Sequence, residues 1–169
     1  MPFAIRQAVL GDASAIAAVQ VASWQSTYIG IVPQPYLDAL RAQAWAANWE
    51  SWLVDASALI FVAEDDAGIF GFIAGGPARE EVAGFDAELY TIYLLGRRQR
   101  GGVGKRLVET LAAHLAAEGY KRIFAWVLEQ NSAVSFYQRL GGIHIAQKST
   151  EIGGVALAEI ALGWNIPQA

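Results

Sequence analysis

Apolar and polar residues alternate over residues 3–8, a pattern that predicts a short strand. Asp12 then stands where the N-cap of a helix is expected, and that helix is predicted to run to about Trp24. Three helix-breaking residues follow and predict a loop: Gly30, Pro33 and Pro35. The first part of the chain therefore reads as a strand, a helix and a loop.

A second helix is predicted over residues 37–53. It carries Trp45, Trp49 and Trp52, whose spacing of four and three residues places them on one helical face. Such a face is more often a packing stripe than a ligand cage, because indole rings bury a large apolar surface. We therefore expect these tryptophans in the core.

The rest of the chain alternates between strands and helices. Strands over 58–63 and 69–75 flank a turn at residues 65–68 and predict a hairpin, and a further strand follows at 85–94. The remaining predicted elements are a helix over 103–117 closed by Gly119, a strand over 123–128, a helix over 132–140, and strands over 143–149 and 156–164. The order β-α-α-β-β-β-α-β-α-β-β has no repeat or low-complexity linker. It predicts a single α/β domain over residues 1–169, with a mixed sheet and helices on both faces.

The composition supports one domain with a large core, since 54% of the residues are hydrophobic and 17% are charged. The net charge of −4 argues against a nucleic-acid partner. The charge is uneven, because residues 1–96 carry three basic and eleven acidic side chains, whereas residues 97–169 carry nine basic and five acidic ones. The basic part suits an anionic ligand, and the acidic part suits a cationic one.

Cysteine is absent, which excludes disulfides, thiolate metal sites and a cysteine-bound intermediate. His114 and His144 have no neighbours at ligand spacing, so no metal site is predicted. Residues 1–24 lack the basic start and apolar stretch of a signal peptide. The longest uncharged run, residues 13–37, is too polar and too broken to cross a bilayer. These features predict a cytoplasmic protein without a membrane partner.

One segment carries most of the candidate chemistry. Residues 96–106, between a predicted strand and a predicted helix, hold five of the twelve basic residues and no acidic one. Glycines let backbone N–H groups approach a ligand, and the following helix presents its positive end, so the segment predicts a phosphate site. Gln99 at the first glycine position and Arg106 after Lys105 exclude a P-loop. Leu107, at the place of the third glycine, argues against a dinucleotide fingerprint.

At this segment the chain resembles the GNAT family of N-acetyltransferases. Residues 99–104, Gln-Arg-Gly-Gly-Val-Gly, match the family's (Q/R)-x-x-G-x-(G/A) pyrophosphate loop between the fourth strand and the third helix. Asn131 followed by Phe136–Gly141 is similar to the family's Asn…Phe-Tyr-x-x-Leu-Gly stretch. One departure is Gly142, where many members have phenylalanine. The resemblance covers essentially the whole chain and implies the GNAT fold, with a mostly antiparallel mixed sheet of about six to seven strands.

The resemblance implies acetyl-CoA as the acetyl donor. Its pyrophosphate would lie on the backbone N–H groups of the loop, and its pantetheine arm would lie along the preceding strand, whose N–H groups would also hold the oxyanion. Asn131 would bond the pantetheine, cap the following helix, or do both. The implied cofactor-binding residues are Ile92, Tyr93, Leu94, Gln99, Arg100, Gly101, Gly102, Val103, Gly104, Lys105 and Asn131.

The resemblance also implies catalytic roles. Glu88 lies eleven residues before Gln99, at the position of the base carboxylate in several family members; the alternative is an ordinary solvent-facing strand glutamate. Asp86, on the same strand face, is the reserve base or an anchor for a cationic acceptor. Tyr137 falls where the family meets the CoA sulfur and is the candidate general acid; the alternative is a half-buried tyrosine that anchors the last helix. Without cysteine, direct attack in a ternary complex is the simpler route.

The acceptor is less well defined. In this fold the loop after the first helix overhangs the acceptor, so Trp24, Tyr28 and Tyr36 are candidates for an aromatic wall that suits a cationic amine; packing between helices is the alternative. We predict an N-acetyltransferase acting on a primary amine, either a small molecule or a peptide N-terminus, with a homodimer as one possible assembly. The competing prediction is a non-catalytic acyl-CoA-binding or regulatory module on the same scaffold.

Overall fold

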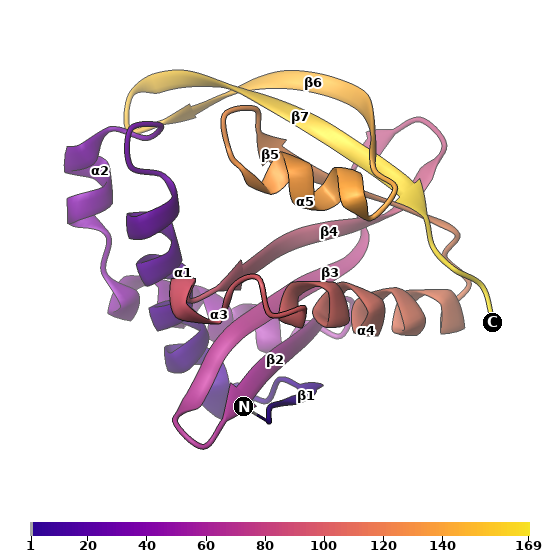
Figure 1. Cartoon of the computed structure of the whole chain (residues 1–169), viewed down its shortest axis with the longest axis horizontal. Coiled ribbons are helices and arrows are strands. Elements are labelled where there is room, and N and C mark those ends of the chain that lie inside the picture. Colours follow the sequence, from indigo (N-terminus) through magenta and orange to yellow (C-terminus); the bar gives the residue numbers. More distant parts are fainter. Residues whose placement is uncertain (1) are drawn as a thin grey trace.

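The computed structural model describes residues 2–169 and contains a seven-stranded sheet with the strand order β1-β2-β3-β4-β5-β7-β6 (Figure 1). All neighbouring strands are antiparallel except β4 and β5, which are parallel. The strands are Ala4–Gln7 (β1), Leu59–Asp65 (β2), Gly68–Val82 (β3), Phe85–Leu94 (β4), Arg122–Leu128 (β5), Ile143–Ile152 (β6) and Val155–Asn165 (β7). The prediction of a mixed, mostly antiparallel sheet is confirmed.

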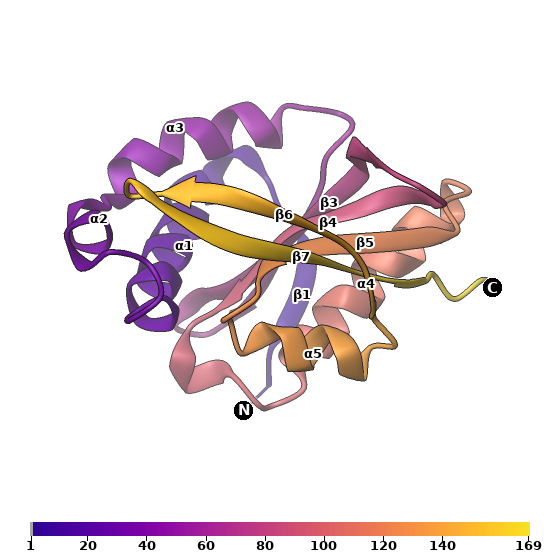
Figure 2. The ribbon, with the colours of Figure 1, turned by 90° about the horizontal axis from the view of Figure 1, so that it is seen from above.

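Helices cover both faces of this sheet, as predicted: α1 and α3 lie on one side, and α4 and α5 on the other (Figure 2). The helices are Ala13–Thr27 (α1), Gln34–Ala39 (α2), Ala42–Leu53 (α3), Val103–Ala117 (α4) and Ala133–Arg139 (α5). Strand alternation separates the two layers, because Phe61 and Ala63 of β2 pack toward α4 while Ile60 and Val62 pack toward α1 and α3. None of the helices within residues 2–169 is long and apolar enough to cross a membrane. The cytoplasmic location stays a prediction.

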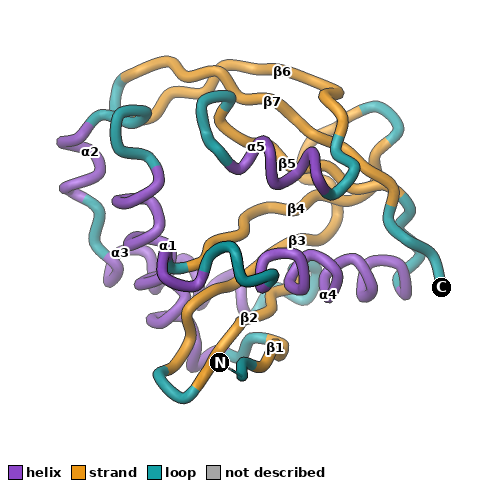
Figure 3. Tube along the Cα trace, viewed as in Figure 1, coloured by secondary structure: helices purple, strands orange, loops and turns teal. Residues whose placement is uncertain are grey.

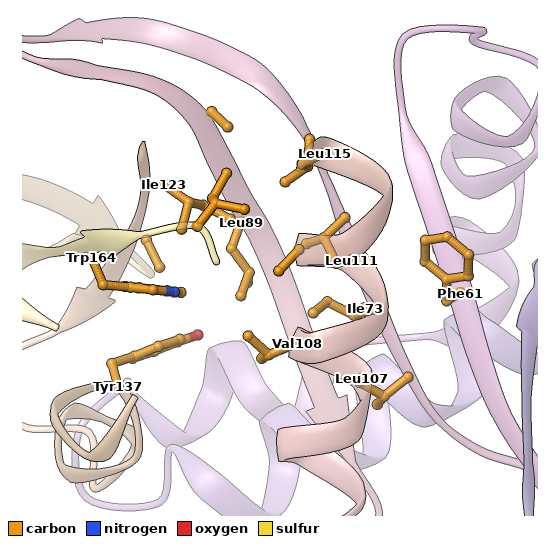
Figure 4. Close-up of a cluster of buried hydrophobic side chains, with 14 of the residues drawn as sticks. Phe61, Ile73, Leu89, Leu107, Val108, Leu111, Leu115, Ile123, Tyr137 and Trp164 are labelled. Atoms are coloured by element: carbon orange, nitrogen blue, oxygen red, sulfur yellow. The ribbon is translucent and has the colours of Figure 1, made fainter. Parts of the chain in front are cut away.

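The best-predicted element is α4, whose bounds match the expected 103–117 and whose C-terminal end carries Gly119 at φ +94°. Its apolar stripe packs on β3 and β4 (Figure 4). Leu107, Leu111 and Leu115 in this stripe have no exposed surface. Burial of each such side chain stabilises the fold by roughly 1.5–3 kcal/mol. This packing fixes the direction of the helix that follows the glycine loop.

The single helix predicted over residues 37–53 is wrong. The chain instead forms α2 and α3, separated at Leu40 and Arg41, whose ψ angles of 135° and 126° are extended. Pro35 lies in the first turn of α2. Proline is tolerated there because the N–H it lacks would have no partner inside the helix. A proline that we interpreted as a loop residue therefore begins a helix.

Asp12 does not cap α1 with its side chain. Its carboxylate accepts a hydrogen bond from the Val9 N–H at 2.8 Å and pairs with Arg6 at 2.7 Å. It thus fastens β1 to the chain that enters α1. The helix also continues three residues beyond the expected end at Trp24, to Thr27.

A β-bulge at Tyr90 reverses the two faces of β4. The pairing with β3 passes from Gly75↔Leu89 to Ala74↔Thr91, so Tyr90 is an extra residue without a partner position. Before the bulge, odd-numbered residues of β4 pack toward α4; after it, even-numbered residues do. A bulge bends its strand and increases the local twist.

The parallel contact between β4 and β5 ends just before this bulge. It consists of Ala87↔Ile123 and Glu88↔Phe124. Beyond these pairs the two strands separate, and the sheet opens between them (Figure 1). The opening lies beside the glycine loop that leads into α4, which is where the candidate site forms.

A contact between distant segments closes one end of this opening. The β6–β7 turn at Gly153 packs against Pro33 and Tyr36, in the segment that joins α1 to α2 and in α2 itself (Figure 3). Tyr36 and Ile152 pack against the same apolar cluster, which includes Leu157 of β7. The segment after the first helix and the last hairpin therefore form one wall.

The close approach of β7 to β4 generates a prediction about stability. A Cβ atom at Gly163 would overlap the Phe85 ring and the Ile145 side chain, so Gly163→Ala overpacks this contact. We expect a loss of about 1–3 kcal/mol in the free energy of unfolding, measured by urea denaturation. Gly11→Ala is the control, because its Cβ would meet no atom within 4 Å. Equal unfolding midpoints for the two variants would contradict this packing.

Candidate active site

A cavity of about 500 Å³ occupies the opening between β4 and β5. Residues from α1, α3, β3, β4, β5, α5, β6 and β7 line it. Its walls are strongly aromatic, with nine such side chains: Trp24, Tyr28, Trp45, Trp49, Trp52, Tyr90, Tyr93, Trp126 and Tyr137. A concave site with mostly apolar walls and a few polar groups is the usual form of a small-molecule site.

The edge of β4 that faces this opening has free backbone groups. The Leu95 N–H donates to the Phe70 carbonyl of β3 at 2.9 Å, which sets the alternation along the antiparallel pair. Ile92 and Leu94 therefore direct their N–H and C=O groups away from β3 and toward the gap. An extended ligand arm can bond such an edge as an added strand does.

The glycine loop supplies a row of free donors next to this edge. Within the described residues, none of the backbone N–H groups from Arg100 to Lys105 donates to a protein acceptor. Arg100 has φ +64° and Gly102 has φ +79°, so two residues of the loop are left-handed. For arginine this conformation costs on the order of 1–2 kcal/mol. Such strain is typical of a backbone nest that is held open for an anion.

Two contacts fix the loop. The Gln99 side chain donates to the Leu94 carbonyl at 3.1 Å, so it joins the loop to the end of β4. Gly104, in the first turn of α4, lies against Phe136 of α5, and a Cβ atom there would lie 3.3 Å from the phenylalanine ring. The helix can approach α5 this closely because residue 104 is glycine.

The basic side chains of this segment are not equivalent. Arg98 is paired with Asp65 and lies over the Phe70 ring at 4.7 Å. The Arg106 guanidinium lies 4.5 Å from the Phe3 ring, and Lys105 pairs with Glu109 at 3.6 Å. Arg97 and Arg100 are exposed and have no ion pair among the described residues, so an anion can meet these two side chains as well as the backbone donors.

Asn131 and two tyrosines form a polar group where the cavity meets α5. The Asn131 Oδ1 accepts from the Ala133 N–H at 2.9 Å, so the predicted helix-capping contact is present. Its Nδ2 donates to the Tyr28 hydroxyl at 3.3 Å, and this hydroxyl lies 3.4 Å from that of Tyr93. Burial raises the pKa of Tyr93, and the Tyr28 hydroxyl acts in the opposite direction.

Tyr137 is buried rather than half-buried, with 5% of its surface exposed. Its ring is stacked on Trp164 at 5.9 Å, and Figure 4 shows both rings pointing toward α4. Burial raises the pKa of the Tyr137 hydroxyl well above its ordinary value, with a smaller effect of Tyr93 in the same direction. The hydroxyl therefore keeps its proton at neutral and moderately alkaline pH.

Glu88 neither faces the cavity, as expected for a catalytic base, nor faces the solvent, as expected for an ordinary strand glutamate. It is 1% exposed, so the alternative of a solvent-facing glutamate is wrong. Arg79 donates to its carboxylate through Nη2 at 2.7 Å, Nε at 3.2 Å and the backbone N–H at 3.0 Å. Glu88 is also absent from the cavity walls, since it lies where β4 is still paired with β5.

The structure separates Asp86 from the other candidates. Its carboxylate accepts hydrogen bonds from the backbone N–H groups of Lys121 and Arg122 at 2.9–3.3 Å, and it does not line the cavity. It holds the chain that enters β5. Trp24 and Tyr28, by contrast, do line the cavity, and Tyr36 packs on Trp24 with 6.3 Å between the rings.

Comparison with known proteins places these features in a family. Residues 21–142 match the acetyltransferase (GNAT) family. The chain belongs to this family. It is 42% identical over 161 residues to the uncharacterized N-acetyltransferase YuaI of Bacillus subtilis strain 168. The aligned residues cover 95% of this chain and 91% of YuaI.

Solved structures share the GNAT fold with this chain. The PaiA N-acetyltransferase of Thermoplasma acidophilum, solved in complex with coenzyme A, has a TM-score of 0.79 and 23% identity over 98% of this chain and 99% of its own. YncA of Salmonella typhimurium, solved with acetyl-CoA, has a TM-score of 0.74 and 19% identity over 100% of this chain and 96% of its own. At these identities the similarity describes the fold.

The α3 side of the cavity contains residues that the sequence analysis did not assign to the site. Trp49 is 4% exposed and packs on Phe72 at 5.0 Å, as expected for a core residue, but Trp45 and Trp52 are half-buried and all three line the cavity. The prediction that the three tryptophans only pack in the core was therefore incomplete. The one sequence signal for their place at the cavity was an aromatic helical face beside an acidic strand.

Charged and polar groups complete the wall. Glu159 and Lys148 lie on the last two strands, and Glu80 lies on β3. Trp126, which also lines the cavity, carries a buried Nε1 atom that has no hydrogen-bond partner among the described residues. Buried unpaired donors are rare and favour a polar ligand in the cavity. In residues 2–169 no group of three or more His, Cys, Asp and Glu side chains is arranged to hold a metal ion.

The pairing of Glu88 with Arg79 generates a prediction about stability. Glu88→Gln removes the charge that holds a guanidinium over the Tyr90 ring, at 4.2 Å, and leaves Arg79 without its carboxylate. We expect the free energy of unfolding to fall by about 1–3 kcal/mol in urea denaturation, because charge-assisted hydrogen bonds are lost. Glu81→Gln, at an exposed position of β3, the strand that carries Arg79, is the control. A Glu88→Gln protein as stable as the control would show that the ion pair contributes nothing.

Proposed function

We propose that this GNAT domain transfers the acetyl group of acetyl-CoA to a primary amine by direct attack in a ternary complex. The observation that carries the proposal is the row of six free N–H groups, Arg100–Lys105, beside the free edge of β4. Ile92, on that edge, also lines the aromatic cavity. The coenzyme A of PaiA and the acetyl-CoA of YncA support the choice of donor.

The donor side divides into two parts. The loop and the N-terminus of α4 hold a pyrophosphate, because consecutive backbone N–H groups and the helix dipole both favour negative charge. Ile92 and Leu94 hold the pantetheine arm through their backbone, and Asn131 lies on the other side of the opening. Acetyl-CoA supplies a thioester, whose carbonyl oxygen gains negative charge during attack. The free N–H groups of Ile92 and Leu94 stabilise that charge.

Tyr137 is the proposed general acid. The departing thiolate needs a proton, and the raised pKa keeps the phenol protonated when the thiolate forms. Among the described residues the Tyr137 hydroxyl makes no hydrogen bond, so it is available to a ligand. Its stacking on Trp164 fixes the direction of the hydroxyl.

The acceptor is a primary amine, either a small molecule or a peptide N-terminus. The cavity offers aromatic faces and the carboxylates of Glu80 and Glu159 to such a group. Aromatic faces attract an ammonium ion, and the carboxylates raise its local concentration. A cavity of about 500 Å³ accepts a whole small molecule or the first residues of a peptide.

The experiment that tests this function measures thiol release from acetyl-CoA with a panel of polyamines, amino acids, aminoglycosides and short peptides. The chain has no cysteine, so the thiol reagent gives no protein background. We expect amine-dependent release by the wild type and an approximately 100-fold lower kcat for Tyr137→Phe, because the proton donor is lost. Tyr120→Phe, outside the cavity, is the matched control.

The result that contradicts the proposal is calorimetric binding of acetyl-CoA without thiol release for any amine. That result favours a non-catalytic acyl-CoA-binding module. A Tyr137→Phe enzyme with wild-type kcat removes the tyrosine from the role of acid and leaves the reaction standing.

The loop generates a separate prediction about binding. Gly102→Val places a β-branched residue at φ +79°, which distorts the nest and moves its N–H groups. We expect the Kd for acetyl-CoA to rise at least 10-fold in isothermal titration calorimetry, the measure of several weakened charge-assisted hydrogen bonds. Gly119→Val carries a similar strain at φ +94° but lies at the far end of α4. Equal affinities for the two variants would exclude the loop as the pyrophosphate site.

A further inference from the structure

The carboxylates of Glu88 and Glu159 lie in opposite environments. Glu88 receives three hydrogen bonds from Arg79, and only 2% of its side chain is exposed. Both of its oxygens are occupied, and it does not face the cavity. Taking up a proton would break this arrangement and leave the Arg79 guanidinium unpaired. Glu88 therefore suits the positioning of Arg79 better than the transfer of a proton.

Glu159 has the complementary environment. It lies on β7 opposite Leu128 of β5, at the point where β5 has left β4, and it lines the cavity together with Tyr93 and Tyr137. Its side chain is 20% exposed. Within residues 2–169 its carboxylate accepts no hydrogen bond, and its ion-pair partner, Lys148, is 4.0 Å away. Its oxygens are free to receive a ligand proton.

Lys148 is held elsewhere. Its ammonium group lies 2.5 Å from the Glu80 carboxylate and 4.1 Å from the centre of the Trp126 ring. Both contacts hold the lysine away from Glu159, so they prevent a short ion pair between Lys148 and the Glu159 carboxylate. Glu80 and Trp126 are thus the groups that keep Glu159 available.

The charges around Glu159 come from three strands. Burial raises the pKa of its carboxyl, Lys148 on β6 lowers it, and Glu80 on β3 raises it. Glu159 in turn raises the pKa of Tyr93 on β4. The net shift of the pKa is upward, and a raised pKa makes the carboxylate a stronger proton acceptor.

We propose that Glu159 accepts the proton that the acceptor amine loses as its nitrogen attacks the thioester carbonyl. The inference rests on the proposed function. A bond forms between the amine nitrogen and the acetyl carbon, the carbon–sulfur bond breaks, and the nitrogen proton passes to the Glu159 carboxylate. Tyr137 protonates the thiolate, and the proton on Glu159 returns through solvent to the tyrosinate, so the products are the amide and the free thiol.

The position of Tyr93 agrees with this assignment. Its hydroxyl interacts electrostatically with both Glu159 and Tyr137. The proposed proton acceptor and proton donor therefore both lie near one half-buried tyrosine, and all three side chains line the same cavity.

The test compares Glu159→Gln, Glu159→Asp, Glu88→Gln and Glu151→Gln, using the panel amine with the highest kcat/KM. We expect Glu159→Gln to lower kcat at least 100-fold at neutral pH, with the Kd for acetyl-CoA within twofold of wild type. The acidic limb of the kcat/KM–pH profile disappears in this variant. Glu159→Asp retains that limb with a lower kcat. Glu151→Gln, exposed on β6 and outside the cavity, behaves as wild type.

A structural role would move different quantities. If Glu159 only shapes the cavity, Glu159→Gln raises the amine KM and keeps both kcat and the acidic limb; this result overturns the inference. The inference is also overturned if the acidic limb of the kcat/KM–pH profile disappears in Glu88→Gln and not in Glu159→Gln. Circular dichroism and acetyl-CoA titration verify that each variant is folded, and if Glu159→Gln is not, the pH profile of Glu159→Asp decides. A wild type that binds acetyl-CoA but acetylates no amine refutes the proposed function itself, which is a different outcome from an active Glu159→Gln enzyme.

Discussion

The site depends on one interruption of backbone pairing, the bulge at Tyr90 that follows a parallel contact of two residue pairs between β4 and β5. A continuous sheet would satisfy every N–H and C=O group in its middle and leave no space for a ligand. Because β4 bends away here, Ile92 and Leu94 keep free backbone groups and a cavity opens beside them. The sheet remains one unit, since β5 is paired with β7 along its whole length.

Two kinds of recognition meet at this opening. The proposed donor side consists of main-chain groups in a strained loop, which suit the shape and charge of a phosphate-bearing arm. The proposed acceptor side consists of side chains from α1, α3, β6 and β7, which are separate from the loop. Of two carboxylates, Glu88 is bonded by Arg79, while Glu159 lines the cavity with its ion-pair partner 4.0 Å away. The fold thus places one carboxylate in a structural ion pair and leaves the other facing the cavity.

Local features were predictable from the sequence, and long-range features were not. The bounds of α4, the glycine loop and the Asn131 contact follow from nearby residues, and they were expected correctly. The break at Leu40 and Arg41 was missed because propensity alone favours a continuous helix there. Glu159 gave no signal in the sequence either, because its place in the cavity depends on the divergence of β4 and β5 after Glu88 and on the pairing of β7 with β5.

The aromatic lining has one more physical consequence. Five of the six tryptophans border the cavity, and the sixth, Trp164, is stacked on Tyr137. Indole emission responds to the polarity and the quenching groups around the ring, and almost every indole in this chain has the site as its neighbour. The tryptophan fluorescence of the protein therefore responds mainly to what occupies the opening in the sheet, with little contribution from the rest of the fold.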